Sequence, residues 1–110
     1  MILKDGETPS AFIRRTTAVL APPLVPEMRL HLAEESIPLW QQTEEALGEA
    51  GLPPPFWAFA WAGGQALARY VLDNPALVQH RSVLDFAAGG GIAGIGAALA
   101  GAEPGAATEI

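Results

Sequence analysis

The sequence predicts an α/β fold in which a helical N-terminal region precedes a single β-α-β unit. Residues 81–87 are expected to form a strand that leads into a Gly-rich loop at Gly89, Gly90 and Gly91, and the Ala-rich segment over residues 92–99 is typical of a helix. A second apolar run starts at Ala106. The order strand, helix, strand is that of a right-handed parallel crossover, the first unit of a doubly wound sheet. Because two parallel strands leave open edges and an uncovered face, we expect this sheet to be incomplete.

A short strand and a first helix are expected before this unit. Met28, Leu30 and Leu32 alternate with polar residues, which is the period of a half-buried strand. The apolar residues after Ser36 have helical spacing, so Ser36 can cap a helix that Gly51 ends.

A second helix is expected over residues 57–73, with Trp57 and Trp61 on its apolar stripe. Gly63 and Gly64 each weaken a helix by roughly 1 kcal/mol relative to alanine. They therefore indicate either close backbone contact or a helix that starts only after Gly64. The expected regions are an N-terminal arm (1–26), a strand and helical region (27–80), and the first β-α-β unit of a ligand-binding domain (81–110).

Composition and charge exclude several classes of function. The 110 residues include six Lys and Arg against twelve Asp and Glu, and this net charge of −6 without a basic stripe argues against nucleic acid. The absence of cysteine removes disulfides, cysteine-based zinc sites and thiol nucleophiles. His31 and His80 have no partner pattern for metal binding or acid–base work, so we expect no metal site. No secretory signal or membrane span is recognisable, and we expect a cytoplasmic protein without membrane contact.

The glycines after the predicted strand have a first interpretation as a dinucleotide site. Gly89, Gly91 and Gly94 match the dinucleotide fingerprint, and Glu109 follows Gly89 by 20 residues, where a ribose-binding acid is expected. An NAD(P)-binding oxidoreductase is therefore one hypothesis. Dinucleotide sites usually place the first glycine at the end of the strand, however, whereas here Asp85 and three further residues come first.

A second interpretation comes from two resemblances. Asp85-x-Ala87-x-Gly89-x-Gly91 resembles the first motif of class I S-adenosylmethionine-dependent methyltransferases, D-x-G-x-G-x-G. The segment over residues 54–70, PPFWAFAWAGGQALARY, is similar to the electron transfer flavoprotein β-subunit lysine methyltransferase family, and this similarity extends over about residues 20–110. The resemblance implies the N-terminal part of a Rossmann-like class I methyltransferase with S-adenosyl-L-methionine as its cofactor. It also implies a protein substrate with a target lysine, for which the electron transfer flavoprotein β subunit is the candidate.

The same resemblance assigns contacts to the cofactor. In related lysine methyltransferases, the tryptophan that matches Trp61 touches the cofactor, as do the loop after the strand and the acid that matches Glu109. Asp85, at the tip of the strand, can organise the cationic methionine end of the cofactor, or it can cap backbone amides. The expected cofactor-binding residues are Trp61, Asp85, Ala87, Ala88, Gly89, Gly91 and Glu109.

The chain also departs from the family pattern. Ala87 stands where the motif has its first glycine, which is tolerable if its φ is negative. Gly94 and Gly96 fall within the predicted helix and would together weaken it by roughly 2 kcal/mol. The groups that hold the lysine follow the second strand in the family, so no catalytic residue can be named and we expect the 110-residue chain to be inactive alone. A third hypothesis is a non-catalytic interaction module that completes its sheet with a partner chain.

Overall fold

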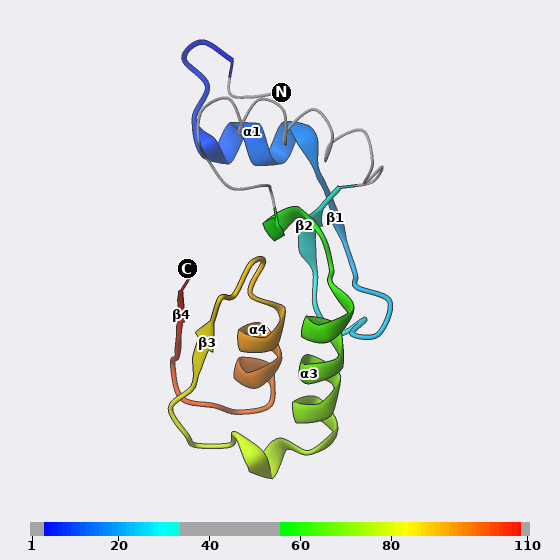
Figure 1. Cartoon of the computed structure of the whole chain (residues 1–110), viewed down its shortest axis with the longest axis vertical. Coiled ribbons are helices and arrows are strands. Elements are labelled where there is room, and N and C mark those ends of the chain that lie inside the picture. Colours follow the sequence, from blue (N-terminus) through cyan, green and yellow to red (C-terminus); the bar gives the residue numbers. More distant parts are fainter. Residues whose placement is uncertain (1–3, 34–55, 109–110) are drawn as a thin grey trace.

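The computed structural model describes residues 4–33 and 56–108 of the chain. A helix and a small antiparallel sheet lie at one end of the molecule, and two helices lie beside two parallel strands at the other (Figure 1). The first helix predicted after Ser36 lies outside the described residues. The helices and strands are α1 (Pro9–Thr16), β1 (Ala18–Leu20), β2 (Leu30–Leu32), α3 (Ala62–Asp73), β3 (Leu84–Phe86), α4 (Ile92–Leu99) and β4 (Ala106–Thr108), with 3₁₀ turns η1 (Phe56–Ala58) and η2 (Pro75–Leu77).

The segment expected as an arm contains regular structure. Thr8 Oγ1 accepts a hydrogen bond from Ala11 N at 3.2 Å and so caps α1, and Pro9 occupies the first position of the helix. β1 follows and pairs antiparallel with β2, with Val19 opposite His31. In the sequence, Thr8 followed by Pro9 was the signal for the start of this helix. The polar composition of the segment favoured an irregular arm instead.

The proline-rich loop between β1 and β2 supplies the centre of the hydrophobic core. Val25 is fully buried and Met28 is 3% exposed, and both pack with Ala68 of α3 and Ile92 of α4. Two successive turns, closed by Val25 N to Pro22 O and by Met28 N to Val25 O, direct these side chains inward. Met28 therefore precedes β2 and does not belong to the strand, contrary to the alternation of the sequence.

α3 begins at Ala62 and not at Trp57, so the predicted start of the second helix is wrong. The aromatic residues before it form the separate turn η1, and Trp61 is the N-cap of α3 with an extended backbone at φ −61° and ψ 143°. The helix ends at Asp73, as predicted. The prediction started the helix too early because Trp57 and Trp61 are four residues apart, a spacing that also fits one face of a helix.

β3 and β4 pair in parallel, which confirms the strand, helix, strand order that the sequence predicted. The regular part of β3 is shorter than the expected strand over 81–87. The two segments are nevertheless hydrogen-bonded before β3 begins, because Glu103 N donates to Arg81 O at 2.9 Å. Gly105 is required at this point, since a Cβ there would lie 2.7 Å from Val83 O. The Glu-Pro-Gly turn is thus fitted to the preceding strand.

α3 and α4 meet at a close contact between Ala68 and Gly96. A Cβ built on Gly96 would lie 2.8 Å from Ala68 Cβ and 2.9 Å from Ala68 Cα. Gly94 is also constrained, because a Cβ there would lie 3.0 Å from Asp85 Oδ2. The expectation that these two glycines only loosen α4 is therefore incomplete. Each lowers helix propensity and in return permits a contact that alanine would block.

One face of the parallel pair is exposed. Leu84 and Phe86 alternate with Asp85 along β3, and they are 62% and 67% exposed. Asp85 instead faces α4, to which it is hydrogen-bonded. This exposed face agrees with the incomplete sheet that the sequence predicted. No helix in the described ranges has the length and apolar character needed to cross a bilayer.

We predict that Gly96→Ala lowers the free energy of unfolding by about 1–2 kcal/mol, because overpacking against Ala68 outweighs the gain in helix propensity. Gly63→Ala is the matched control, since a Cβ there meets nothing within 4 Å. It should raise stability by up to about 1 kcal/mol. Urea unfolding followed by circular dichroism measures both variants. Equal effects would contradict the close contact between the two helices.

Candidate functional site

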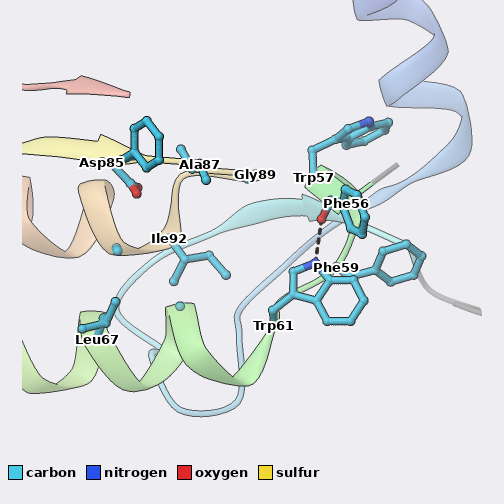
Figure 2. Close-up of a pocket in the computed structure, with 14 residues that line it drawn as sticks. Phe56, Trp57, Phe59, Trp61, Leu67, Asp85, Ala87, Gly89 and Ile92 are labelled. Atoms are coloured by element: carbon cyan, nitrogen blue, oxygen red, sulfur yellow. Dashed lines mark hydrogen bonds between the residues drawn. The ribbon is translucent and has the colours of Figure 1, made fainter. Parts of the chain in front are cut away.

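A cavity of about 830 Å³ opens at the carboxyl end of β3, between the Gly-rich loop and the start of α3. Its volume falls within the range of about 300–1,000 Å³ that is typical of small-molecule sites. Figure 2 shows the side chains of Phe56, Trp57, Phe59 and Trp61 at one side of this cavity, and those of Asp85 and Leu67 at the other. The lining residues are Phe56, Trp57, Phe59, Trp61, Gly64, Leu67, Asp85, Phe86, Ala87, Ala88, Gly89, Gly90, Ile92 and Ala93.

Most of the predicted cofactor-binding residues come together at this cavity. Gly91 does not line it; it is the N-cap of α4 and lines a separate cavity of about 360 Å³. Glu109 lies outside the described residues. The predicted residues that line the cavity are Trp61, Asp85, Ala87, Ala88 and Gly89.

Left-handed backbone at alternate residues shapes the Gly-rich loop. Ala87, Gly89 and Gly91 have φ values of +57°, +56° and +83°, and Gly91 N donates to Ala88 O at 2.8 Å. Glycine adopts this region without steric cost, whereas the Cβ of alanine costs roughly 1–2 kcal/mol there. The negative φ under which Ala87 was expected to be tolerable is therefore not present. The loop keeps its glycine-type shape and is strained at this residue.

The Gly-rich loop packs directly on the backbone of η1. A Cβ at Gly90 would lie 3.0 Å from Trp57 O, and one at Gly89 would lie 3.9 Å from Phe56 O. A side chain at Gly90 would push the turn away from the loop. The Gly-rich loop and η1 are distant in the sequence. They pack against each other at the cavity because Gly90 has no side chain at the point of contact.

Trp61 closes the turn between η1 and α3. Its indole Nε1 donates to Phe56 O at 2.9 Å. Its ring centroid lies 6.2 Å from that of Phe56 and 5.7 Å from that of Phe59, with both pairs inclined at 57°. These are the distances of packed aromatic rings. Trp61 is still 49% exposed and lines the cavity, and its role in contacting a cofactor stays a prediction.

Asp85 connects β3 to the start of α4. Its Oδ2 accepts a hydrogen bond at 2.8 Å from Gly94 N, the amide of the third residue of the helix. Because the N-cap Gly91 has no side chain, Asp85 satisfies an amide that lacks an intrahelical partner. Of the two roles predicted for Asp85, capping of backbone amides is therefore observed. Its contact with a cofactor stays a prediction, and its place in the cavity lining is compatible with it.

Asp85 is the single titratable side chain among the described residues that line the cavity. The described ion pairs, which centre on Arg15 and Arg69, lie outside this lining. Within the described ranges, no group of three or more His, Asp or Glu side chains could hold a metal ion. The site therefore suits a ligand with an apolar body and a cationic group.

Sequence reasoning did not assign the other nine lining residues to the site, namely Phe56, Trp57, Phe59, Gly64, Leu67, Phe86, Gly90, Ile92 and Ala93. For Phe56, Trp57 and Phe59 the available signal was the density of aromatic residues before Gly63, but the prediction used only Trp57 and Trp61, as part of the apolar stripe of a helix. Nothing in the spacing of Leu67 or Ile92 separates a cavity wall from a core contact.

A Gly-rich loop after a parallel strand, with the start of a helix behind it, is the arrangement of a nucleotide-cofactor site in an α/β protein. The curated proteins that match the chain are lysine methyltransferases, and the resemblance predicted from residues 54–70 is thereby confirmed. The chain is a homologue of the electron transfer flavoprotein β-subunit lysine methyltransferases.

Three relatives show the extent of the likeness. The chain is 45% identical over 96 residues to the homologue of this methyltransferase in Caenorhabditis elegans, 43% over 95 residues to the enzyme of Xenopus laevis, and 38% over 94 residues to that of Homo sapiens. These matches cover 87%, 86% and 84% of the chain but only 38%, 37% and 35% of the relatives, so the chain spans little more than a third of their length. No family model and no solved structure matches the chain.

We predict that Ala87→Gly raises the free energy of unfolding by about 1 kcal/mol, because glycine adopts the left-handed backbone without the steric cost of a Cβ. Ala88→Gly is the matched control, since Ala88 is the next residue of the same loop and its φ is not positive. It should lower stability by about 0.4–1 kcal/mol. Thermal unfolding of the three chains distinguishes the cases. An Ala87→Gly chain no more stable than the Ala88→Gly chain would contradict the left-handed conformation.

Proposed function

We propose that the chain forms the N-terminal part of the cofactor-binding domain of an S-adenosylmethionine-dependent protein-lysine methyltransferase, with a Rossmann-like sheet. One observation carries this proposal: Trp61 and the loop over residues 87–89, which the family resemblance assigned to the cofactor, line the same cavity. The names of the relatives support a protein acceptor, and we propose a lysine of an electron transfer flavoprotein β subunit as the methylated group.

The residues of the cavity fit this cofactor. Its methionine end carries an ammonium, a carboxylate and a sulfonium, and its adenosyl end has the flat face of the adenine and two ribose hydroxyls. Asp85 would lie near the cationic end, and the loop backbone at Ala88 and Gly89 would approach the polar groups. The half-exposed face of Trp61 would pack on the ligand, and Glu109 is the proposed acceptor for the ribose hydroxyls.

The fit to a dinucleotide is poorer for an electrostatic reason. A dinucleotide site places the pyrophosphate at the N-terminus of the helix that follows the Gly-rich loop. In this chain the carboxylate of Asp85 already occupies the amide of Gly94 at that helix end. A second negative group would be repelled there, and no described lining residue carries a positive charge to offset it.

When bound, S-adenosylmethionine supplies an electrophilic methyl group. The residues of this chain would bind and orient the donor, and the aromatic wall of Phe56 and Trp61 would keep water from one side of it. Alignment of donor and acceptor is the main catalytic contribution in such a displacement. The acceptor lysine must also lose a proton, since its pKa is ordinarily about 10.4. No described lining residue is placed for that task, so we expect it from residues outside the described part.

Calorimetric titration of the 110-residue chain with S-adenosylhomocysteine, and with NAD as the control ligand, tests the cofactor class. We expect S-adenosylhomocysteine to bind and NAD to bind at least about tenfold more weakly, because the capped helix end repels phosphate. Stronger binding of NAD would favour the dinucleotide alternative. Binding of neither ligand by a folded oligomer would favour an interaction module, for which the exposed Leu84 and Phe86 are the supporting observation.

The contribution of the aromatic wall has its own test. Trp61→Ala should weaken the binding of S-adenosylhomocysteine by about tenfold, since a lost aromatic contact costs on the order of 1 kcal/mol. Tyr70→Ala is the matched control, because Tyr70 is an aromatic residue of α3 that is 58% exposed and does not line the cavity. Circular dichroism checks that both variants are folded. Equal affinities for the two variants would contradict the proposed contact.

A further inference from the structure

Gln65 is a buried polar residue in the first part of α3. It is 7% exposed and is the one polar or charged residue among the described buried side chains. Its Oε1 accepts a hydrogen bond from Leu24 N at 2.9 Å, and its Nε2 donates to Ala60 O at 2.6 Å. The side-chain amide therefore connects the backbone of the β1–β2 loop to the backbone just before Trp61. A buried amide whose donor and acceptor are both used holds its partners in place, because losing either bond leaves an unpaired polar group.

The first partner of Gln65 is itself firmly held. Arg69 lies one turn further along α3, and its Nη1 donates to Leu24 O at 3.2 Å. The N–H and the C=O of Leu24 are thus bound by two side chains of the same helix. Arg69 also forms a bidentate pair with Glu27 at 2.8 and 2.7 Å, and its hydrogen bonds hold the pKa of Glu27 below its usual range. The loop over residues 22–28 is therefore a fixed point against which Gln65 can act.

The second partner of Gln65 lies in the wall of the cavity. Ala60 O belongs to the segment between η1 and α3, and Trp61 follows directly. Trp61 Nε1 in turn holds Phe56 O, and Trp57 O contacts the loop at Gly90. A continuous path of contacts therefore runs from the Leu24 peptide through Gln65 to the aromatic wall and the Gly-rich loop.

We propose that Gln65 is a positioning residue of the cofactor site, which holds the segment 56–61 at the distance from the Gly-rich loop that the cofactor requires. This inference rests on the proposed function. It adds a residue that touches neither the cavity nor any ligand in it, because Gln65 is absent from the lining and acts through Ala60 and Trp61.

The variant Gln65→Glu makes this role titratable. Its carboxylate would keep the bond from Leu24 N but would face Ala60 O with a negatively charged oxygen, and protonation would restore a donor. Burial and the facing carbonyl raise the pKa of such a carboxyl, whereas the nearby guanidinium of Arg69 opposes this rise. Other titratable groups of the neighbouring elements are Glu27 and Asp73, which are both bound to Arg69, and His31 of β2, which is hydrogen-bonded to Thr17. These groups are also present in the wild-type chain, which therefore serves as the reference at each pH.

The affinity for S-adenosylhomocysteine is measured by calorimetry at about pH 5.5 and about pH 8. For Gln65→Glu we expect binding about tenfold weaker than wild type at the higher pH and recovery to within about threefold at the lower pH, because only the protonated carboxyl donates to Ala60 O. Gln65→Met has a similar length but no titrating group, and it should lose affinity equally at both pH values.

Thr8→Ala is the matched control for a purely structural role. It removes the side-chain cap of α1, which lies outside the path from Leu24 through Gln65 to the Gly-rich loop, so it should lower the unfolding temperature and leave the affinity near that of wild type. If the Gln65 variants behave in the same way, with lost stability and unchanged affinity, the positioning role is overturned.

A ligand-free measurement separates this inference from the proposed function. In a ¹H–¹⁵N spectrum of the Gln65→Met chain, the amide signals of Gly89 and Gly90 should shift, because these glycines lie against the carbonyls of Phe56 and Trp57. Unchanged signals would overturn the positioning role even if the cofactor binds. If the signals shift but the wild-type chain binds no S-adenosylhomocysteine, the positioning role of Gln65 is supported and only the proposed cofactor is contradicted.

Discussion

The structure depends on the close approach of α3 and α4 at Ala68 and Gly96. Because Gly96 has no side chain at this point, the two helices pack closely, and the start of α3 lies near the loop before α4. Gly90 can then lie against Trp57 O, and the aromatic turn becomes a wall of the cavity at the end of β3. A larger residue at Gly96 would move both walls, so a core contact also sets the geometry of the site.

Hydrogen bonds of buried and partly buried side chains hold further segments against these two helices. Gln65 and Arg69, one turn apart on α3, bind the N–H and the C=O of Leu24 and hold the β1–β2 loop against the helix. Asp85 does the same for α4, since it supplies the cap that Gly91 cannot. Gln65 and Asp85 each connect elements that are adjacent in space but distant in sequence. Asp85 therefore supports the fold and also lines the candidate site, whereas Gln65 supports the fold close to that site.

The sequence predicted the β-α-β unit because apolar runs, a helix composition and a Gly-rich loop are local patterns. The five predicted residues that line the cavity came from the resemblance to class I methyltransferases. It missed the start of α3, since the spacing of Trp57 and Trp61 also fits a helix. It interpreted Gly94 and Gly96 as a weakness of α4, because nothing local reveals Asp85 or Ala68 as neighbours. Glu109 lies outside the described residues, and its role stays a prediction.

By itself the sequence determined the strand, helix, strand order of residues 81–110 and the resemblance to lysine methyltransferases, since each depends on neighbours along the chain. Only the tertiary structure determined that Ala87 has a left-handed backbone, that Asp85 caps α4, and that Gln65 connects Leu24 to Ala60. These features depend on contacts between segments brought together by packing. A backbone angle or a buried hydrogen bond across such a contact has no signature in local composition or spacing.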